Sequence, residues 1–203
     1  MKIMKGIIVL VVSLGIAISL NAQTAKEFFV LMPDEMLLDL NRSGKMDLVD
    51  LYEAGREAAI VNKLGDTLLL EKLTPDYLLL NTGKSSLQIV VLSMLNESQL
   101  YCFIQTACGP VCDSRVEFYS PSWKKLNAEA FITPAPPAWF IQANADFAAP
   151  AVSFMQWLYD PDTSTLQQIN RTPDYLSEED RRMIQPYITK ESRDYHWNGI
   201  RFE

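Results

Sequence analysis

Oxygen-bearing side chains between residues 39 and 50 follow the spacing of a twelve-residue calcium-binding loop. The donors stand at loop positions one, three, five, nine and twelve, which are Asp39, Asn41, Ser43, Asp47 and Asp50. A glycine stands at position six, where such a loop turns sharply, and helical patterns flank the segment. Because a calcium ion takes roughly six to eight oxygen ligands, convergence of these side chains would form a calcium site. One interpretation is therefore a calcium-stabilised module.

The same segment also fits a polar turn between two helices. Position five is a serine, position twelve is Asp50 where a bidentate glutamate is usual, and Arg42 and Lys45 bring positive charge into the loop. In this alternative, Asp47 caps the following helix. The residue types favour the turn, and calcium is the one cofactor that the sequence leaves open.

Cys108 and Cys112 enclose a Gly-Pro turn, so a local disulfide between them is conceivable, with two buried thiols as the alternative. A catalytic redox pair would have two residues between its cysteines rather than three. It would also lie next to a βαβ unit, which this sequence pattern does not predict. Cys102 lies in an apolar run, where a free thiol packs like a small hydrophobic side chain.

His196 is the only histidine, so a hydrolase that uses histidine as its base would have to use this residue. A metal site of two or three imidazoles is excluded, and no serine lies in a Gly-x-Ser-x-Gly motif. A partly exposed histidine on a sheet is the favoured interpretation. An envelope enzyme using Cys108 or His196 remains an alternative to a non-enzymatic protein.

The tryptophans offer a binding surface. If exposed together, they could form a stacking platform for sugars or for a protein partner, and the residues concerned are Trp123, Trp139, Trp157 and Trp197. Packing in the core is the simpler use for most of them.

The elements that must position these residues change in kind along the chain. Residues 24 to about 58 have a helical pattern, with a capping box at Thr24 and Glu27 and a break at Gly44. From residue 60 the period changes to two, which predicts strands at residues 67–71, 77–81, 87–95, 100–106 and 115–119. The short turns between them predict an antiparallel β-meander.

A Pro-rich segment at residues 133–150 follows, as a crossing segment and a potential sub-boundary. After it the pattern predicts a hairpin at residues 152–170, a short helix capped by Ser177, and a strand at residues 195–202. The fold class expected is α+β, with N-terminal helices packed on an antiparallel sheet.

Residues 1–22 have the pattern of an export signal. Lys2 and Lys5 precede an apolar run from residue 6 to residue 18, and small Ala22 marks the expected cleavage site. This predicts a single domain at residues 23–203, periplasmic or secreted, with no lipid-acceptor cysteine after the apolar run. Loss of two lysines would move the net charge from −7 to −9, which argues against binding to nucleic acid or anionic lipid.

Three stretches, residues 32–50, 73–80 and 108–123, resemble an uncharacterised secreted family of gut Bacteroidales. The resemblance implies an exported single-domain protein, a domain of unknown function, and carries over no catalytic or binding residue. The function expected is non-enzymatic binding of a protein or glycan in the cell envelope.

Overall fold

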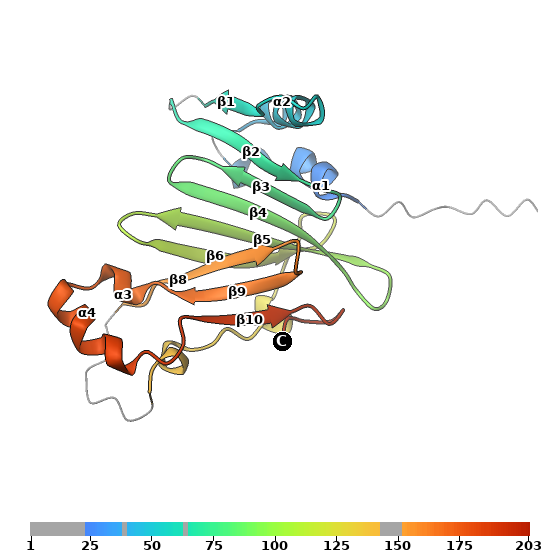
Figure 1. The fold of residues 1–203 in the computed structure, drawn as a ribbon. Helices are drawn as coiled ribbons and strands as arrows, with labels where there is room; N and C mark the ends of the chain where they lie inside the picture. Colours follow the sequence, from blue (N-terminus) through green and yellow to red (C-terminus); the bar gives the residue numbers. More distant parts are fainter. Residues whose placement is uncertain (1–22, 38–39, 63–64, 143–151) are drawn as a thin grey trace, which may run out of the picture.

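The computed structural model describes residues 23–37, 40–62, 65–142 and 152–203 (Figure 1). The expected export signal, Asp39 and the end of the Pro-rich segment lie outside the described residues. Among the described residues, no helix is long and apolar enough to cross a membrane.

A seven-stranded antiparallel sheet, in which each strand pairs with the next along the chain, forms the centre of the fold. Its strands are β1 (Ala59–Val61), β2 (Thr67–Leu73), β3 (Tyr77–Asn81), β4 (Ser85–Ser93), β5 (Gln99–Cys108), β6 (Cys112–Tyr119) and β7 (Lys125–Leu126). The α+β meander predicted from the alternating pattern is confirmed. The longest pairing, β4 with β5, runs from Ser85 opposite Ala107 to Ser93 opposite Gln99.

Two helices, α1 (Ala25–Leu31) and α2 (Arg42–Glu53), cover one face of this sheet. The capping box at Thr24 and Glu27 begins α1, and Phe28 and Phe29 bury its apolar face. A short 3-10 turn, η1 (Asp34–Met36), lies between the helices. Together with the odd-numbered side chains of β4 they form the first core, which contains Leu48, Leu87 and Ile89.

The expected helix break at Gly44 is wrong, because α2 begins before it. The side chain of Asn41 caps the helix by accepting a hydrogen bond from the Gly44 N–H, at 3.0 Å. A Cβ atom at Gly44 would lie 2.6 Å from the Leu40 side chain. The glycine therefore permits close packing within the first turn of a helix.

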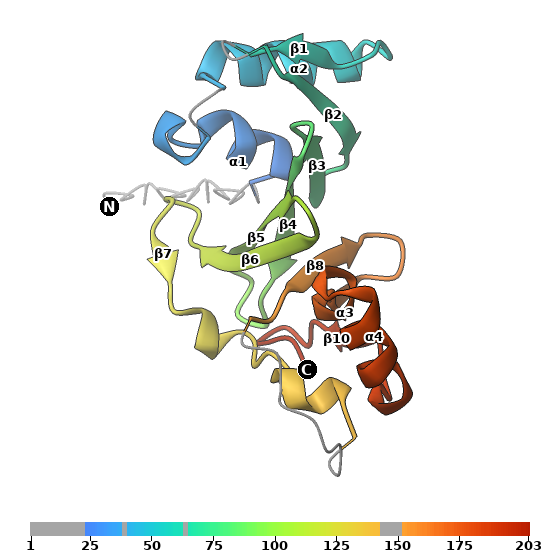
Figure 2. The ribbon, with the colours of Figure 1, turned by 90° about the vertical axis from the view of Figure 1, so that its left-hand side faces the viewer.

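The opposite face of the large sheet packs against a second, three-stranded sheet in the order β10-β9-β8. Its strands are β8 (Met155–Asp160), β9 (Thr165–Asn170) and β10 (Ser192–His196), with α3 (Thr172–Tyr175), α4 (Glu178–Ile184) and the turn η4 (Gln185–Tyr187) between β9 and β10. Two further turns, η2 (Ala128–Ala130) and η3 (Pro137–Phe140), lie in the connection that precedes β8. Figure 2 shows α1 and α2 at one end of the molecule and this C-terminal sheet at the other.

The last strand is shorter and earlier than expected, since the pattern predicted residues 195–202. The chain turns back at Gly199, where φ is +89°, and the Asn198 side chain accepts the N–H groups of Ile200 and Arg201. Trp197 consequently lies opposite Phe202 in an isolated bridge. A strand through residue 202 would have required this glycine turn to be extended.

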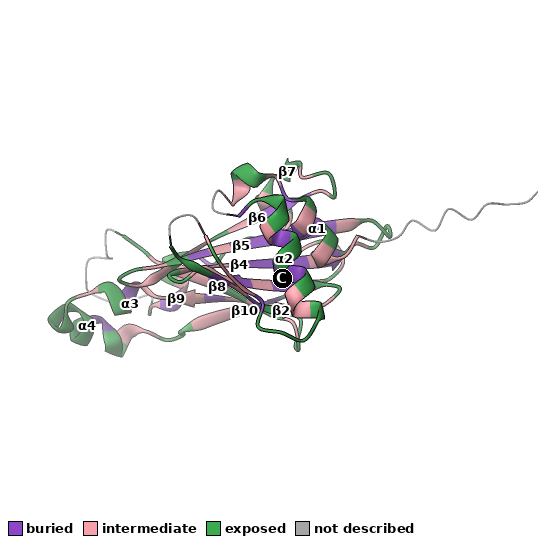
Figure 3. Cartoon of the chain, turned by 90° about the horizontal axis from the view of Figure 1, so that it is seen from above, coloured by how far each residue is buried: buried purple, intermediate pink, exposed green. Residues whose placement is uncertain are grey.

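The free edge of β8 is attached to the large sheet by side chains. The N–H groups of Met155, Trp157 and Tyr159 donate, at 2.9 Å each, to acceptors from β4 and β6: Asp113 Oδ1, Ser114 Oγ and Gln88 Oε1. Side-chain oxygens thus replace the strand that would otherwise pair with this edge. Figure 3 shows buried residues along β4 and β5 and beneath α1 and α2, whereas α4 is largely exposed.

Candidate functional site

A groove of about 790 Å³ lies in the corner between the outer face of the C-terminal sheet and the part of the large sheet that this smaller sheet leaves uncovered. We call it the corner groove. From the large sheet it is lined by Lys72, Tyr77, Leu79, Asn81, Ser86 and Gln88, and from the C-terminal sheet and its hairpin by Leu158, Tyr159, Asp160, Pro161, Thr163, Thr165, Gln167 and Asp194.

Two tyrosines and one buried glutamine form the base of the groove. Gln88 Oε1 accepts from the Tyr77 hydroxyl at 3.1 Å and from the Tyr159 N–H at 2.9 Å. The rings of Tyr77 and Tyr159 lie 5.9 Å apart. Burial raises the pKa of both hydroxyl groups, so they stay neutral at physiological pH. The base is therefore rigid and uncharged.

Polar groups around the groove are held in fixed orientations. Gln167 Nε2 donates to Asp194 Oδ1 at 2.9 Å, and Asn81 Nδ2 donates to Glu71 at 2.7 Å. Asp160 accepts from Thr163, and this hydrogen bond, followed by one from a backbone N–H, lowers the pKa of Asp160. Leu158, 36% exposed, adds an apolar surface between these polar groups. Such an arrangement can bind a ligand that is both hydroxylated and apolar.

The four tryptophans do not share one surface. Trp123 stacks on Phe28 in the first core at 3.6 Å, whereas Trp157 is buried in the second core. Trp197 packs on Phe202 beside that core, and Trp139 lies under the ammonium group of Lys190. The aromatic side chains that line the groove are tyrosines instead.

Cys108 and His196, the residues considered for an envelope enzyme, lie on different sheets. Cys108 forms a disulfide with Cys112, at an S–S distance of 1.99 Å, and Cys102 is a buried free thiol whose pKa is raised by burial. His196 is exposed on β10, with Nδ1 3.4 Å from the Thr165 hydroxyl. The disulfide leaves Cys108 without the free thiolate that a nucleophile requires.

The calcium-loop interpretation is corrected by α2. Ser43, Asp47 and Asp50 lie within the helix, and Asn41 uses its side-chain oxygen as the N-cap. A calcium loop needs an irregular backbone that turns its oxygens inward, which a helix does not provide. Nor does any group of three or more His, Cys, Asp or Glu in the described part of the chain have the arrangement of a metal site.

Lys45 belongs to the packing of α2 and not to a metal site. The side chain is fully buried, and its ammonium group donates to the Met32 carbonyl and, at 2.9 Å, to Asp34. The lysine thus ties α2 to the turn that precedes it. The positive charge that counted against a calcium loop in the sequence has a structural partner outside the loop.

Apolar side chains also collect on the solvent side of the two N-terminal helices. Val30, Leu31, Met46 and Val49 line a shallow depression of about 310 Å³, with Leu31 51% and Met46 46% exposed. We call it the helix patch. Lys26 and Glu53 form an ion pair of 2.8 Å at its border, and the hydrogen bond to Glu53 raises the pKa of Lys26.

The corner groove was not predicted from the sequence. Its residues come from two sheets, and their meeting depends on the docking of β8. One available signal was Gln88, a buried amide between the apolar residues Leu87 and Ile89. A buried amide must find hydrogen-bond partners, so it marks a contact that the strand pattern alone does not specify.

Comparison with known proteins supports the fold and the family. Among solved structures, a domain of an uncharacterized protein from Porphyromonas gingivalis W83 is similar, with a TM-score of 0.77 and 22% identity over 90% of this chain and 98% of that chain. No curated protein matches the sequence. A family profile described as "Protein of unknown function (DUF3256)" matches residues 17–202. The resemblance to an uncharacterised family is thereby confirmed, and the chain belongs to the DUF3256 family.

Proposed function

We propose that this protein is an exported, non-enzymatic binding module that takes a glycan in the corner groove. The observation that carries the proposal is the combination, in one groove, of an apolar surface at Leu79 and Leu158 with oriented amide and hydroxyl groups. A sugar ring presents C–H faces and a rim of hydroxyl groups. Such a ligand can use both kinds of surface at once.

The backbone of the groove favours a glycan over an extended peptide. A peptide bound as an added strand needs a free strand edge. In the described structure, β3, β4 and β9 are paired on both sides, and alternate N–H groups along the edge of β8 are taken by side chains. Along these four strands, a ligand is therefore recognised by side chains.

Export is supported by two features. The pattern of residues 1–22 is that of a signal sequence, and the Cys108–Cys112 disulfide is a bond that persists in oxidising compartments. Fractionation of cells that express the full sequence, with mass determination of the mature N-terminus, tests this part. A product that starts near residue 23 outside the cytoplasm is expected, and an uncleaved cytoplasmic product would contradict it.

A glycan array followed by calorimetry tests the binding proposal. We expect Leu158→Ser to weaken glycan binding by about tenfold, because the apolar contact in the groove is lost. Leu31→Ser is the matched control, since it removes an exposed leucine from the helix patch. Equal effects of the two substitutions, or no glycan bound by the unmodified protein, would overturn the proposal.

A protein partner is the second candidate, favoured by the exposed apolar side chains of the helix patch. The same two variants separate the alternatives. If a protein from the cell envelope binds to this patch, Leu31→Ser abolishes its capture while Leu158→Ser leaves it intact.

A further inference from the structure

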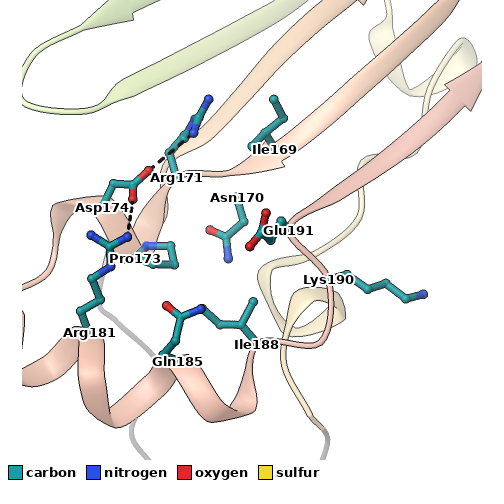
Figure 4. Close-up of a pocket in the computed structure, with 10 residues that line it drawn as sticks. All are labelled: Ile169, Asn170, Arg171, Pro173, Asp174, Arg181, Gln185, Ile188, Lys190 and Glu191. Atoms are coloured by element: carbon teal, nitrogen blue, oxygen red, sulfur yellow. Dashed lines mark ion pairs between the residues drawn. The ribbon is translucent and has the colours of Figure 1, made fainter.

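A second cavity, of about 210 Å³, lies where β9 ends and the chain passes through α3 and α4 toward β10 (Figure 4). Three apolar side chains, Ile169, Pro173 and Ile188, contribute to its lining. Charged side chains of both signs complete it. This polar and apolar mixture lies outside the corner groove, with which it shares no residue.

One wall of the cavity carries two arginines that share a single carboxylate. Asp174 lies 3.6 Å from Arg171 and 3.4 Å from Arg181, which is longer than the roughly 2.7–2.9 Å of a charge-assisted hydrogen bond. Arg171 is also fixed from behind, because its Nε donates to Gln156 at 2.8 Å. Two positive charges with one negative charge leave this wall with a net positive charge.

The other wall carries Glu191. In Figure 4 its carboxylate lies beside Asn170, on the side of the cavity away from Asp174 and Arg181. The main chain at Glu191 is held beside the end of β9, because the Glu191 carbonyl accepts from the Asn170 N–H at 3.0 Å. Among the described residues, no ion pair neutralises the Glu191 carboxylate.

Lys190 does not supply the missing positive charge. Its ammonium group lies 4.0 Å from the centre of the Trp139 ring, and the side chain points away from the cavity in Figure 4. The cavity therefore keeps a positive wall and a negative wall, with apolar side chains between them.

We propose that this cavity binds a small zwitterion, an α-amino acid with an aliphatic side chain. Its carboxylate pairs with Arg181 and Arg171, its ammonium group pairs with Glu191, and its side chain contacts Ile169 and Ile188. A simple anion would leave Glu191 without a counter-charge. A simple cation would leave Arg171 and Arg181 with Asp174 as their shared counter-charge. Glu191 and Arg181 are both exposed and hydrated before a ligand binds, so a ligand with both charges is favoured because it forms a charge pair with each wall where a simple ion forms one with a single wall.

Calorimetry with three related probes tests this assignment on the purified protein. L-leucine carries both charges, N-acetyl-L-leucine only the negative one and L-leucinamide only the positive one. We expect leucine to bind with a dissociation constant on the order of 1 mM, and each blocked compound to bind about tenfold more weakly. Equal binding of either blocked compound, or no binding of leucine, would overturn the proposal.

Substitutions on the two walls give a second, independent measurement. Arg181→Gln and Glu191→Gln each weaken leucine binding by about tenfold. In Glu191→Gln, leucine also loses its advantage over N-acetyl-L-leucine, a change of preference that partial unfolding would not produce. The control is Arg182→Gln, which removes the neighbouring arginine, paired with Glu178 at 3.1 Å and absent from the cavity lining. An equal loss of leucine affinity in Arg182→Gln would contradict the assignment.

The experiment is independent of the glycan proposal. Leu158→Ser alters the corner groove and should leave leucine binding unchanged, because the two sites share no lining residue. If it abolishes leucine binding while the protein stays folded, the two cavities are not separate sites and the assignment fails.

Discussion

Glu117 on β6 is a buried carboxylate whose neighbours keep it ionised. Burial raises its pKa, but hydrogen bonds from Lys125 and Tyr119 and the charge of Arg115 outweigh that effect, so the pKa of Glu117 is lowered. The same contacts act on Tyr119: burial, and then its hydrogen bond to Glu117, raise the pKa of Tyr119 to about 12. The pair is therefore most stable with the acid charged and the phenol neutral.

The pH dependence of stability follows from this lowered pKa. A carboxyl group with a depressed folded-state pKa stabilises the fold fully above its unfolded pKa of about 4.3, and loses that contribution as pH falls through the folded-state value. We expect Glu117→Gln to lower the free energy of unfolding by about 1–3 kcal/mol at pH 7. Urea unfolding at several pH values should show this difference shrinking below about pH 4.

The matched control is Glu129→Gln, which neutralises an exposed glutamate. Its effect on the free energy of unfolding should stay within about 0.5 kcal/mol at every pH. A Glu117→Gln difference that grows on acidification would mean that the carboxyl group is destabilised in the fold.

Single residues also show what the sequence alone could not decide about the site. The spacing of oxygens from Asp39 to Asp50 was visible, but spacing does not distinguish a loop from a helix. The deciding contacts are the Asn41 cap and the burial of the Lys45 ammonium group against the Met32 carbonyl. The cap is a local contact across three residues, but the burial of Lys45 depends on how the chain folds back, which a linear motif does not encode.

At the scale of elements, Gln88 is the main polar contact between β4 and β8. Replacement by leucine would leave the Tyr159 N–H and the Tyr77 hydroxyl without their acceptor in a buried interface. Since each unpaired buried group costs about 1–3 kcal/mol, we expect Gln88→Leu to lower the free energy of unfolding by about 3 kcal/mol. Urea denaturation measures this loss.

Gln105→Leu serves as the comparison, because Gln105 lies on β5 of the same sheet and its side chain accepts, within the described structure, from the exposed Arg115. Its cost should be below about 1 kcal/mol. If both substitutions cost the same, Gln88 does not hold the two sheets together.

The Cys108–Cys112 disulfide closes a very short loop at the end of the β5–β6 hairpin. A loop of this length stabilises by about 2 kcal/mol in the chain-entropy model. We expect the double variant Cys108→Ser, Cys112→Ser to fold and to lose at most that amount, because the two cores are built from other residues. Calorimetric melting of the variant checks this, and failure to fold would contradict it.

Elements were predictable where their periodicity was strong. The bounds expected for β3 agree with the structure, and β9 ends at Asn170, where the predicted hairpin ends, because turn residues flank both strands. The final strand was misplaced, since the aromatic residues around Trp197 look strand-like although Asn198 and Gly199 turn the chain. A turn within an aromatic run is decided by local side-chain hydrogen bonds, which are weak signals in a sequence.

At the scale of the whole molecule, one sheet serves two cores. Successive side chains of β4 alternate between them: Leu87 and Ile89 belong to the first, Val90 and Leu92 to the second. The sequence predicted the helix-covered face. It did not predict that a separate sheet would cover part of the opposite face of the large sheet. That smaller sheet is attached through residues that lie far apart in the chain.

A shared sheet makes the two halves unfold together. Loss of either core exposes the apolar side chains that β4 and β5 contribute to it, and this destabilises the two strands on whose opposite face the other core is built. Trp123 reports on the first core and Trp157, 5% exposed, on the second. Two variants allow the cores to be followed separately. Each keeps one of these residues as its sole tryptophan and has phenylalanine at the other three positions.

Within each variant, we expect the fluorescence midpoint in urea to coincide with the midpoint from far-ultraviolet circular dichroism, because the whole chain unfolds in one step. A fluorescence midpoint that precedes the loss of secondary structure in one variant would mean that its core melts alone, and would make the Pro-rich segment at residues 133–150 a true boundary between two units.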